Sequence, residues 1–237
     1  MKLISDIRYF ESTKENSDGY FPSYIGNLFH INYKNFSIIN TRFVLKLREK
    51  EFLLPDFDHI YVNFTTCLEE GKFELAKRLP DKHHQFYRFI DFGLSPQCFN
   101  KLSVQEKNVL LITSVANIIG SLYCKDDNKR KIVRNCADDI LKSDENTKII
   151  YKCKKNENFC VQIVVSILDN GLYSPCIRIY DNNQKLINEY IYNIPLRQDE
   201  FIYQFGSISI GKKSINIKPK NNSLSSSCQF KILKYFI

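Results

Sequence analysis

Three residues in the N-terminal third of the chain have the types and spacing of a metal-dependent phosphodiester-cleaving site. Pro55-Asp56 is followed by Glu70-Gly71-Lys72, which matches in letters the pattern PD…ExK. In that chemistry two carboxylates hold a divalent cation and a lysine stabilises the attacked phosphate. Asp56 precedes a strand pattern, but Glu70 and Lys72 fall in a stretch that is typical of a loop. A Mg²⁺-dependent nuclease using Asp56, Glu70 and Lys72 is therefore one hypothesis, and a solvated loop is the competing interpretation.

A second candidate is a nucleic-acid surface near the C-terminus. Its residues are Lys212, Lys213, Lys218 and Lys220. On a strand, Ile215 and Ile217 would face the core while Lys218 and Lys220 project together on the other side. The aromatic residues, 14 Tyr and 18 Phe, mostly alternate with aliphatic ones, which is typical of core aromatics rather than of a base-stacking platform. An edge strand whose lysines prevent aggregation is the competing interpretation.

Two acidic pairs could receive a basic partner. They are Glu69-Glu70, in the same predicted loop, and Asp138-Asp139, which should be exposed within a predicted helix. These four residues are the candidate partner-binding residues, and a role in solubility explains them equally well.

Other chemistry-bearing patterns are absent from the sequence. There is no GxxxxGK[ST], GxGxxG or GxSxG segment. The eight cysteines form no CxxC pair and the four histidines lack zinc-site spacing, so no metal and no cofactor are expected. The cysteines are interpreted as small buried hydrophobic residues.

Length and composition are those of a packed protein with one large or two small domains. The chain has 237 residues, of which 43% are hydrophobic and 25% charged. Its net charge of +8 is uneven, with +2 in residues 1–144 and +6 in residues 145–237. No apolar run approaches the ~20 residues that span a bilayer, and no signal peptide is evident, so we expect a cytoplasmic protein without membrane contact.

The first third of the chain shows strand patterns with polar connections. Strands are predicted around Leu3–Tyr9, within Ser37–Leu47, over Phe57–Thr66 and over Phe86–Phe92. In Phe57–Thr66 the residues Ile60, Val62 and Phe64 share one face, and Tyr61 and Asn63 share the other.

The central segment changes to a helical period. Ser103-Val-Gln-Glu106 is a capping box that opens a helix over Val104–Tyr123. A second helix follows a polar turn, starts at Asp126 or Asp127 and carries a buried stripe through Val133, Cys136 and Ile140. The two helices should form an antiparallel hairpin.

The last third is β-rich. Short alternating segments separated by turns, including Asn170-Gly171, predict a C-terminal antiparallel meander. The fold class is therefore α+β, with N-terminal strands, a central antiparallel helix pair and this meander, one of whose faces the helix pair should cover. A boundary near Ser143–Asn146 gives domains 1–144 and 145–237, unless the two form one continuous domain.

The order of elements over residues 55–220 resembles that of immunity proteins of bacterial polymorphic and contact-dependent toxin systems. The residues that carry the resemblance are the strand Phe57–Thr66, the segment Tyr87–Gly93, and Phe99–Ser103 with Glu106-Lys107 opening the helix. The resemblance implies a non-enzymatic cytosolic protein that binds and blocks one cognate toxin domain. Such proteins are often acidic when the toxin is a basic nuclease, whereas this chain is basic, so a neutral or acidic toxin surface or a local acidic patch is then required.

Overall fold

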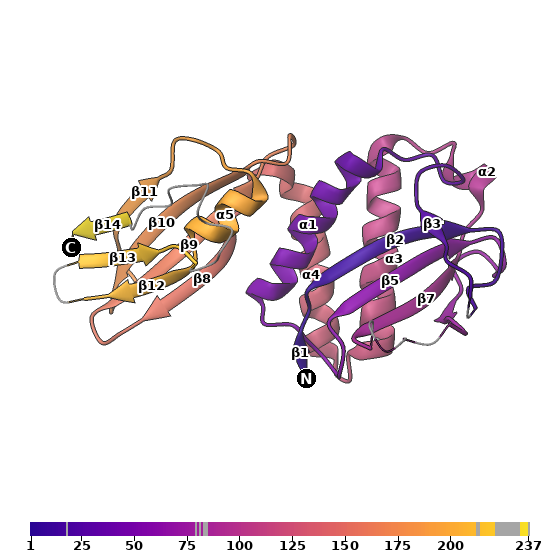
Figure 1. Ribbon diagram of the computed structural model, residues 1–237, viewed down its shortest axis with the longest axis horizontal. Helices are drawn as coiled ribbons and strands as arrows, with labels where there is room; N and C mark the ends of the chain where they lie inside the picture. The colour runs from indigo at the N-terminus through magenta and orange to yellow at the C-terminus, as the bar shows by residue number, and fades with distance from the viewer. Residues whose placement is uncertain are drawn as a thin grey trace. The chain divides into compact units, whose positions relative to one another are not determined.

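The computed structural model describes residues 1–17, 19–78, 80, 82, 85–211, 214–220 and 233–236 (Figure 1). It divides into two compact units, Met1–Asp144 and Glu145–Ile237. The first unit mixes helices and strands and the second consists mainly of antiparallel strands, so the predicted α+β class is confirmed. Among the described residues, no helix is long and apolar enough to cross a membrane.

The N-terminal unit is built on a five-stranded sheet in the order β3-β2-β5-β7-β6. Its strands are β2 (Asp6–Ser12), β3 (Ser23–Tyr24), β5 (His59–Thr65), β6 (Phe73–Leu75) and β7 (Tyr87–Gly93). The central strands β2, β5 and β7 run parallel, whereas β3 and β6 pair antiparallel at the edges. A separate short pair joins β1 (Lys2–Leu3) to β4 (Leu53–Leu54). Parallel neighbours need long crossovers, and helix α1 (Tyr33–Glu49) lies in the one from β2 to β5.

The predicted strand within Ser37–Leu47 is wrong, because this segment belongs to α1. The Asn32 side chain caps the helix by accepting a hydrogen bond from the backbone N–H of Asn35 at 3.2 Å. The strand-like alternation at residues 43, 45 and 47 is too short to compete with a helical period that runs through the whole segment. The buried residues on that period include Phe36, Asn40, Phe43, Val44 and Leu47.

The first central helix has the predicted bounds and the second has the predicted start. They are α3 (Val104–Tyr123) and α4 (Asp127–Ser143), and a short helix α2 (Pro96–Phe99) precedes them. The Ser103 hydroxyl accepts from the backbone N–H of Glu106 at 3.3 Å, and the Glu106 carboxylate accepts from that of Ser103 at 2.8 Å, so the capping box is confirmed. Asp126 caps α4 by accepting from the backbone N–H of Lys129 at 2.8 Å.

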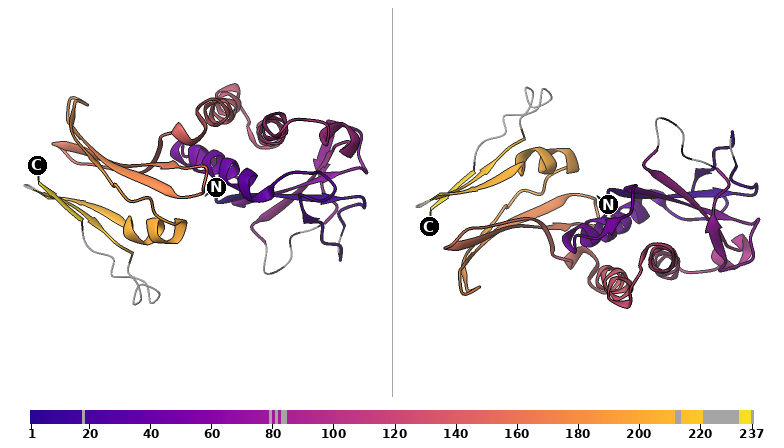
Figure 2. Two further views of the ribbon diagram at one scale, coloured as in Figure 1. Left: turned by 90° about the horizontal axis from the view of Figure 1, so that it is seen from above. Right: turned by 90° about the horizontal axis from the view of Figure 1, so that it is seen from below.

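The sequence patterns assigned the helix pair to the C-terminal meander, and this is corrected: helices α1, α3 and α4 pack on one face of the N-terminal sheet, in the core of their own unit (Figure 2). The predicted alternation in β5 explains why the helices pack there. Ile60, Val62 and Phe64 give the sheet an apolar face, and this face and the apolar stripes of the helices form one core.

The C-terminal unit contains two antiparallel sheets. The four-stranded sheet has the order β11-β10-β9-β8 and the three-stranded sheet the order β12-β13-β14. Their strands are β8 (Ile149–Lys155), β9 (Phe159–Ile167), β10 (Tyr173–Asp181), β11 (Leu186–Ile191), β12 (Ser207–Ile210), β13 (Ser214–Lys218) and β14 (Leu233–Phe236), and a 3₁₀ turn spans Asp144–Asn146. Gly171 has a φ of 84°, as the predicted Asn170-Gly171 turn between β9 and β10 requires.

The core of this unit combines aliphatic strand residues with a small aromatic cluster. Helix α5 (Gln198–Gln204), which the sequence patterns did not predict, buries Phe201 completely against Tyr173 and Phe205, each with its ring centroid 5.1 Å away. Seven residues are too few to display a helical period. The ring centroids of Tyr190 on β11 and Tyr235 on β14 lie 4.5 Å apart and connect the two sheets.

The cysteines follow the sequence interpretation only in part. Cys124, Cys136 and Cys176 are buried as expected, whereas three others are exposed. The exposed ones are Cys67, Cys98 and Cys153. Cys228 lies outside the described residues.

Candidate functional site

The face of the N-terminal sheet opposite the helices is rich in aromatic and arginine side chains. Alternation along the strands sends Arg8 and Phe10 of β2, Tyr61 of β5, and Tyr87 and Phe89 of β7 to this side. The strand register places Arg8 beside Tyr61, and Tyr61 beside Phe89. We call the surface formed by Arg8, Phe10, Tyr24, Tyr61, Tyr87 and Phe89 the aromatic face.

The rings of the aromatic face touch one another continuously. Tyr61 stands at the centre, with ring centroids 4.6 Å from Tyr87, 5.3 Å from Phe10 and 5.6 Å from Phe89. Phe10 also lies 4.9 Å from Tyr24 of the edge strand β3. Burial raises the pKa of Tyr61, and its hydrogen bond with Tyr87 raises it further. The Tyr61 hydroxyl is therefore neutral at ordinary pH.

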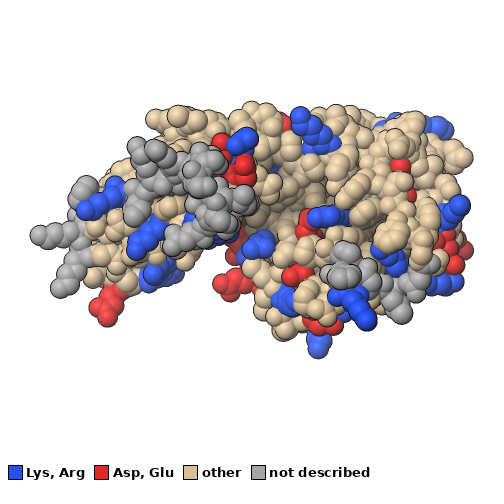
Figure 3. All heavy atoms as spheres, in the orientation of Figure 1, with Lys and Arg blue, Asp and Glu red and all other residues tan. Residues whose placement is uncertain are grey.

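Two arginines lie over these rings. The guanidinium of Arg8 is 5.4 Å from the ring centre of Tyr61 and pairs with Asp6 at 2.7 Å. The guanidinium of Arg78 lies 4.0 Å from the ring centre of Phe21 and 4.3 Å from that of Phe89. Basic and acidic side chains are interspersed over a largely uncharged surface in this part of the molecule (Figure 3).

A cavity of about 210 Å³ opens on the aromatic face. Residues of three sheet strands, of β3 and of the loops around it line the cavity. They are Arg8, Phe10, Asn16, Phe21, Pro22, Tyr24, Tyr61, Asn63, Arg78, Tyr87 and Phe89. Asn63 lies toward the carboxyl end of β5, and ligands of open sheets with parallel strands commonly bind at that end.

Besides two arginines, the cavity lining includes two buried amides. Asn16 and Asn63 are each only 1% exposed. The Nδ2 of Asn63 donates to Asp91 at 2.7 Å and to the Ser12 hydroxyl at 3.0 Å, and the Asn16 side chain also hydrogen-bonds Asp91. Within the described chain, neither Asn16 Oδ1 nor Asn63 Oδ1 has a hydrogen-bond partner. Both oxygens are buried from solvent, so these two amides support the cavity wall rather than present free acceptors.

Burial raises the pKa of Asp91, and its hydrogen bonds from Asn63 and Asn16 counteract part of that rise. Asp91 is 4% exposed and pairs with Asn63 across β5 and β7. It lies behind the two amides and fixes their orientation.

The residues of the nuclease hypothesis do not come together. Asp56 precedes β5 and pairs with Arg88 at 2.7 Å, whereas Glu70 and Lys72 follow that strand. Seven residues of extended strand separate the two ends by roughly 20 Å. Lys72 instead forms an exposed ion pair with Glu69 at 2.5 Å. The geometry gives no common metal site for Asp56 and Glu70.

The two acidic pairs lie on different structural elements, which are adjacent neither in sequence nor in a sheet. Glu69 and Glu70 are exposed in the loop after β5. Asp138 and Asp139 are exposed on α4, as predicted. Asp138 lines a groove between α3 and α4, where basic side chains accompany it. These are Arg130, Lys131 and Arg134.

For the C-terminal lysines the structure confirms part of the prediction. Ile215 and Ile217 are completely buried, and Lys218 and Lys220 are exposed. The edge-strand interpretation is wrong, because β13 pairs with both β12 and β14. Lys212 and Lys213 lie outside the described residues, so half of the candidate surface has no structural description.

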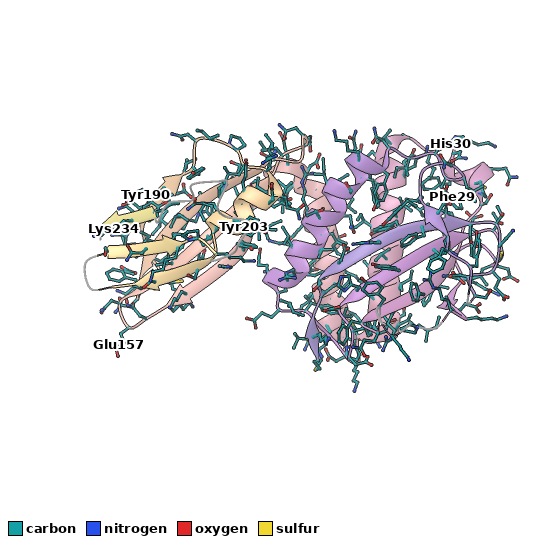
Figure 4. All side chains as sticks on the ribbon, viewed as in Figure 1. Phe29, His30, Glu157, Tyr190, Tyr203 and Lys234 are labelled. Atoms are coloured by element: carbon teal, nitrogen blue, oxygen red, sulfur yellow. The ribbon has the colours of Figure 1, made fainter. Side chains whose placement is uncertain are left out.

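Two histidines are described. The Nδ1 of His59 lies 2.5 Å from the Asp58 carboxylate. His30 is exposed at the α2 end of the unit, beside the buried Phe29 (Figure 4). Within the described ranges, no group of three or more His, Cys, Asp or Glu side chains could hold a metal ion.

The interpretation of the aromatic residues as core holds only in part for the aromatic face. Tyr61 and Phe89 are buried, at 8% and 7% exposed, although they lie outside the core under the helices, whereas Tyr24 is 51% exposed. The sequence already indicated that Tyr61 faces away from the apolar side of β5, because Tyr61 and Asn63 alternate with Ile60, Val62 and Phe64 along β5.

Comparison with protein-family models, with curated proteins and with solved structures finds no match to this chain.

Proposed function

We propose that this chain is a non-enzymatic binding protein that holds another protein on its aromatic face. The observation that supports this most strongly is the composition of that face, where tyrosine, phenylalanine and arginine side chains contact one another on the side of the sheet away from the helices. Tyrosine and arginine are, with tryptophan, the residues that contribute most to binding energy in protein interfaces. Aromatic residues and arginine are also enriched in the buried centres of interfaces.

The charges around the aromatic face favour a protein partner over a long polyanion. Arg8 is paired with Asp6, and Lys77 with Glu15 at 2.5 Å. A nucleic-acid backbone is bound best by a surface of one sign, whereas protein interfaces combine charges of both signs around an apolar centre.

The resemblance to immunity proteins suggests the class of partner, a toxin domain that the chain binds and blocks by covering its working surface. A standard interface buries about 800 Å² on each side, so the whole aromatic face and its flanking loops would contribute. The aromatic face then takes the place of the acidic pairs as the principal contact surface.

The experiment is a pull-down with the tagged full-length chain from native lysate, followed by mass spectrometry. The wild type is compared with the double variant Tyr24→Ala/Tyr87→Ala and with a control variant, Tyr180→Ala. Tyr180 is a partly exposed tyrosine on β10 of the C-terminal unit. We expect one stoichiometric protein with the wild type and with Tyr180→Ala. Its affinity for the double variant should be at least about thirtyfold lower, as loss of interface anchors predicts.

The captured protein is then expressed alone and together with each variant. A toxin stops growth alone, and the wild-type chain and Tyr180→Ala restore growth while the double variant does not. A captured protein that stays bound to the double variant contradicts the assignment of the surface. A captured protein that does not affect growth contradicts the toxin-inhibitor role.

A further inference from the structure

We propose that the C-terminal unit binds the phosphate backbone of a double-stranded nucleic acid on the outward face of its three-stranded sheet. The contacts are electrostatic and read no base sequence. This surface belongs to a different unit from the aromatic face, so the proposal goes beyond the binding of a protein partner and does not depend on it.

The strand register gives the sheet β12-β13-β14 one apolar and one polar face. Ile215 and Ile217 of β13 are completely buried, and Ile208 of β12 lies opposite Ile217 on the same side. Because side chains alternate along a strand, the residues next to these isoleucines point the other way. We call the surface that they form, together with the residue Lys220 that follows β13, the lysine face. It consists of Ser207, Ser209, Asn216, Lys218, Lys220 and Lys234.

The lysine face concentrates positive charge. Lys218, Lys220 and Lys234 are all exposed. Lys234 pairs with Asn216 across β14 and β13, so Lys218 is its diagonal neighbour. Diagonal neighbours on one face of a sheet lie roughly 7–8 Å apart. That distance is about two steps of a nucleic-acid strand, which carries one phosphate per about 3.4 Å.

A fourth lysine lies beside this face. The Lys152 amine of β8 donates to the backbone carbonyls of Phe205, at 2.9 Å, and of Gly206, immediately before β12. Burial lowers the pKa of Lys152, and the positive charge of Lys220 lowers it further. The two ammonium groups therefore repel each other, and a bound anion would relieve this repulsion.

No acidic side chain balances these charges on the three strands. The sequence has no Asp or Glu after Glu200, so none belongs to β12, β13 or β14. Within the part of the chain that the structure describes, neither Lys218 nor Lys220 forms an ion pair. Lysine or arginine side chains are visible over β12 and β13 in Figure 3. On the other sheet of the unit, by contrast, Glu189 pairs with Arg178 at 2.6 Å.

Protection of a sheet edge does not explain these lysines. Lysines that prevent aggregation belong on edge strands, where backbone N–H and C=O groups are unpaired. Lys218 lies on β13, which is the central strand of its sheet and is paired on both sides. Its charge is therefore placed on a face of the sheet, where a flat or gently curved partner can reach it.

The chemistry of the lysine face favours a double helix as the partner. Lysine, serine and asparagine side chains donate hydrogen bonds to phosphate oxygens. The side chains described on this face include no ring on which an unpaired base could stack and no large apolar group that could enter a bilayer. A double helix keeps its bases stacked within itself and carries one charge per about 1.7 Å, twice the density of a single strand.

The test measures binding of a fluorescent DNA duplex of about 20 base pairs to the purified full-length chain by anisotropy, between about 25 and 200 mM salt. We expect binding at about 50 mM salt, and a slope of log K against log salt concentration of about −3 or steeper, because each lysine that neutralises a phosphate contributes about −0.9. The double variant Lys218→Gln/Lys220→Gln should bind at least about tenfold more weakly and make the slope shallower by about 2.

The matched control is Lys101→Gln/Lys142→Gln, which removes the same charge from two exposed positions of the N-terminal unit. It should change neither the affinity nor the slope, which separates a defined surface from the net charge of the whole chain. Lys218→Arg/Lys220→Arg keeps the charge and should keep the slope. Lys234→Gln, on another strand, should make the slope shallower by about 1 and keeps the test valid if the double variant fails to fold.

Three results would overturn the proposal. The first is no binding of the duplex at about 50 mM salt. The second is an equal loss of affinity in Lys218→Gln/Lys220→Gln and in the control variant. The third is tighter binding of a single strand of the same length, or of phosphatidylserine vesicles, than of the duplex. No protein partner is present in this measurement, so its failure leaves the protein-binding proposal untouched.

Discussion

The carboxylate of Asp91 accepts a hydrogen bond from Asn63 Nδ2 at 2.7 Å, across the neighbouring parallel strands β7 and β5. Asn16, from the loop after β2, hydrogen-bonds the same carboxylate. One buried acid thus fixes two asparagines that belong to the cavity wall. Asp91 therefore orients two residues of the cavity wall although it does not line the cavity itself.

Asp91 should make the stability of the protein depend on pH. Burial raises its pKa above the ordinary value of 3.8, so the folded protein holds this proton more tightly than the unfolded chain does. The contribution of Asp91 to the free energy of unfolding is therefore fully present below the unfolded pKa and is lost as the pH rises through the folded pKa. Asp91→Asn removes this titration.

We expect the difference in unfolding free energy, wild type minus Asp91→Asn, to fall as the pH rises through this window and then to stay constant. Urea unfolding in steps between about pH 3.5 and pH 7 measures it. Taking the difference cancels the titration of carboxylates shared by both proteins. A difference that increases with pH would show that the hydrogen bonds from the asparagines, rather than burial, dominate.

Glu11 should be among the most important polar residues for stability. It is 4% exposed, and its carboxylate accepts from four successive backbone N–H groups at 2.9–3.1 Å. Those groups belong to Gly26, Asn27, Leu28 and Phe29. Glu11→Ala should lower the unfolding free energy by about 3 kcal/mol or more, because buried donors lose their acceptor. Glu11→Gln keeps one oxygen and should lose less.

Urea unfolding of the full chain tests this, with Glu15→Ala as the control. Glu15 is exposed and pairs with Lys77 on the surface, so its removal should cost less than about 1 kcal/mol. Equal losses for Glu11→Ala and Glu15→Ala would contradict a special role for Glu11.

Two glycine substitutions should change stability in opposite directions. A Cβ at Gly93, the last residue of β7, would overlap the backbone carbonyl of Glu69. Gly93→Ala should therefore destabilise the protein by about 2–4 kcal/mol. A Cβ at Gly120 in α3 would meet only the Cγ of Arg130 at 3.9 Å. Gly120→Ala should stabilise the protein by up to about 1 kcal/mol, because alanine favours the helix. Thermal unfolding of the two variants measures both signs, and a stabilised Gly93→Ala would refute the close approach.

Local sequence patterns were sufficient to predict the central helices, but they predicted a strand where α1 lies. Ser103 and Glu106 are three residues apart, and their reciprocal hydrogen bonds fix the start of α3 without help from the rest of the fold. In α1 the β-branched and aromatic residues of Ser37–Leu47 have strand propensity, but packing of its apolar stripe on the sheet overrides that propensity.

The candidate site could not be predicted from local sequence patterns alone. The alternation in β5 shows that Tyr61 and Asn63 face away from Ile60, but it does not show which side the helices cover. The cavity also depends on the parallel register that places Asn63 beside Asp91, and on a loop residue, Asn16, that belongs to no periodic segment. Both arise only when distant segments fold together.

The thiol of Cys153 should react slowly at mildly alkaline pH. Although Cys153 is an exposed residue, its thiol is partly shielded from solvent, and this, together with the Cys160 thiol 3.5 Å away, raises the pKa of Cys153 to about 11. Because only the thiolate reacts, about 0.1% of Cys153 is reactive at pH 8. Its rate of alkylation by iodoacetamide should rise about tenfold per pH unit and level off only near pH 11. Peptide mass spectrometry measures this rate, and Cys160→Ala should move the midpoint to lower pH. A rate that already levels off by about pH 9 would show that the two thiols do not interact as the β8–β9 hairpin places them.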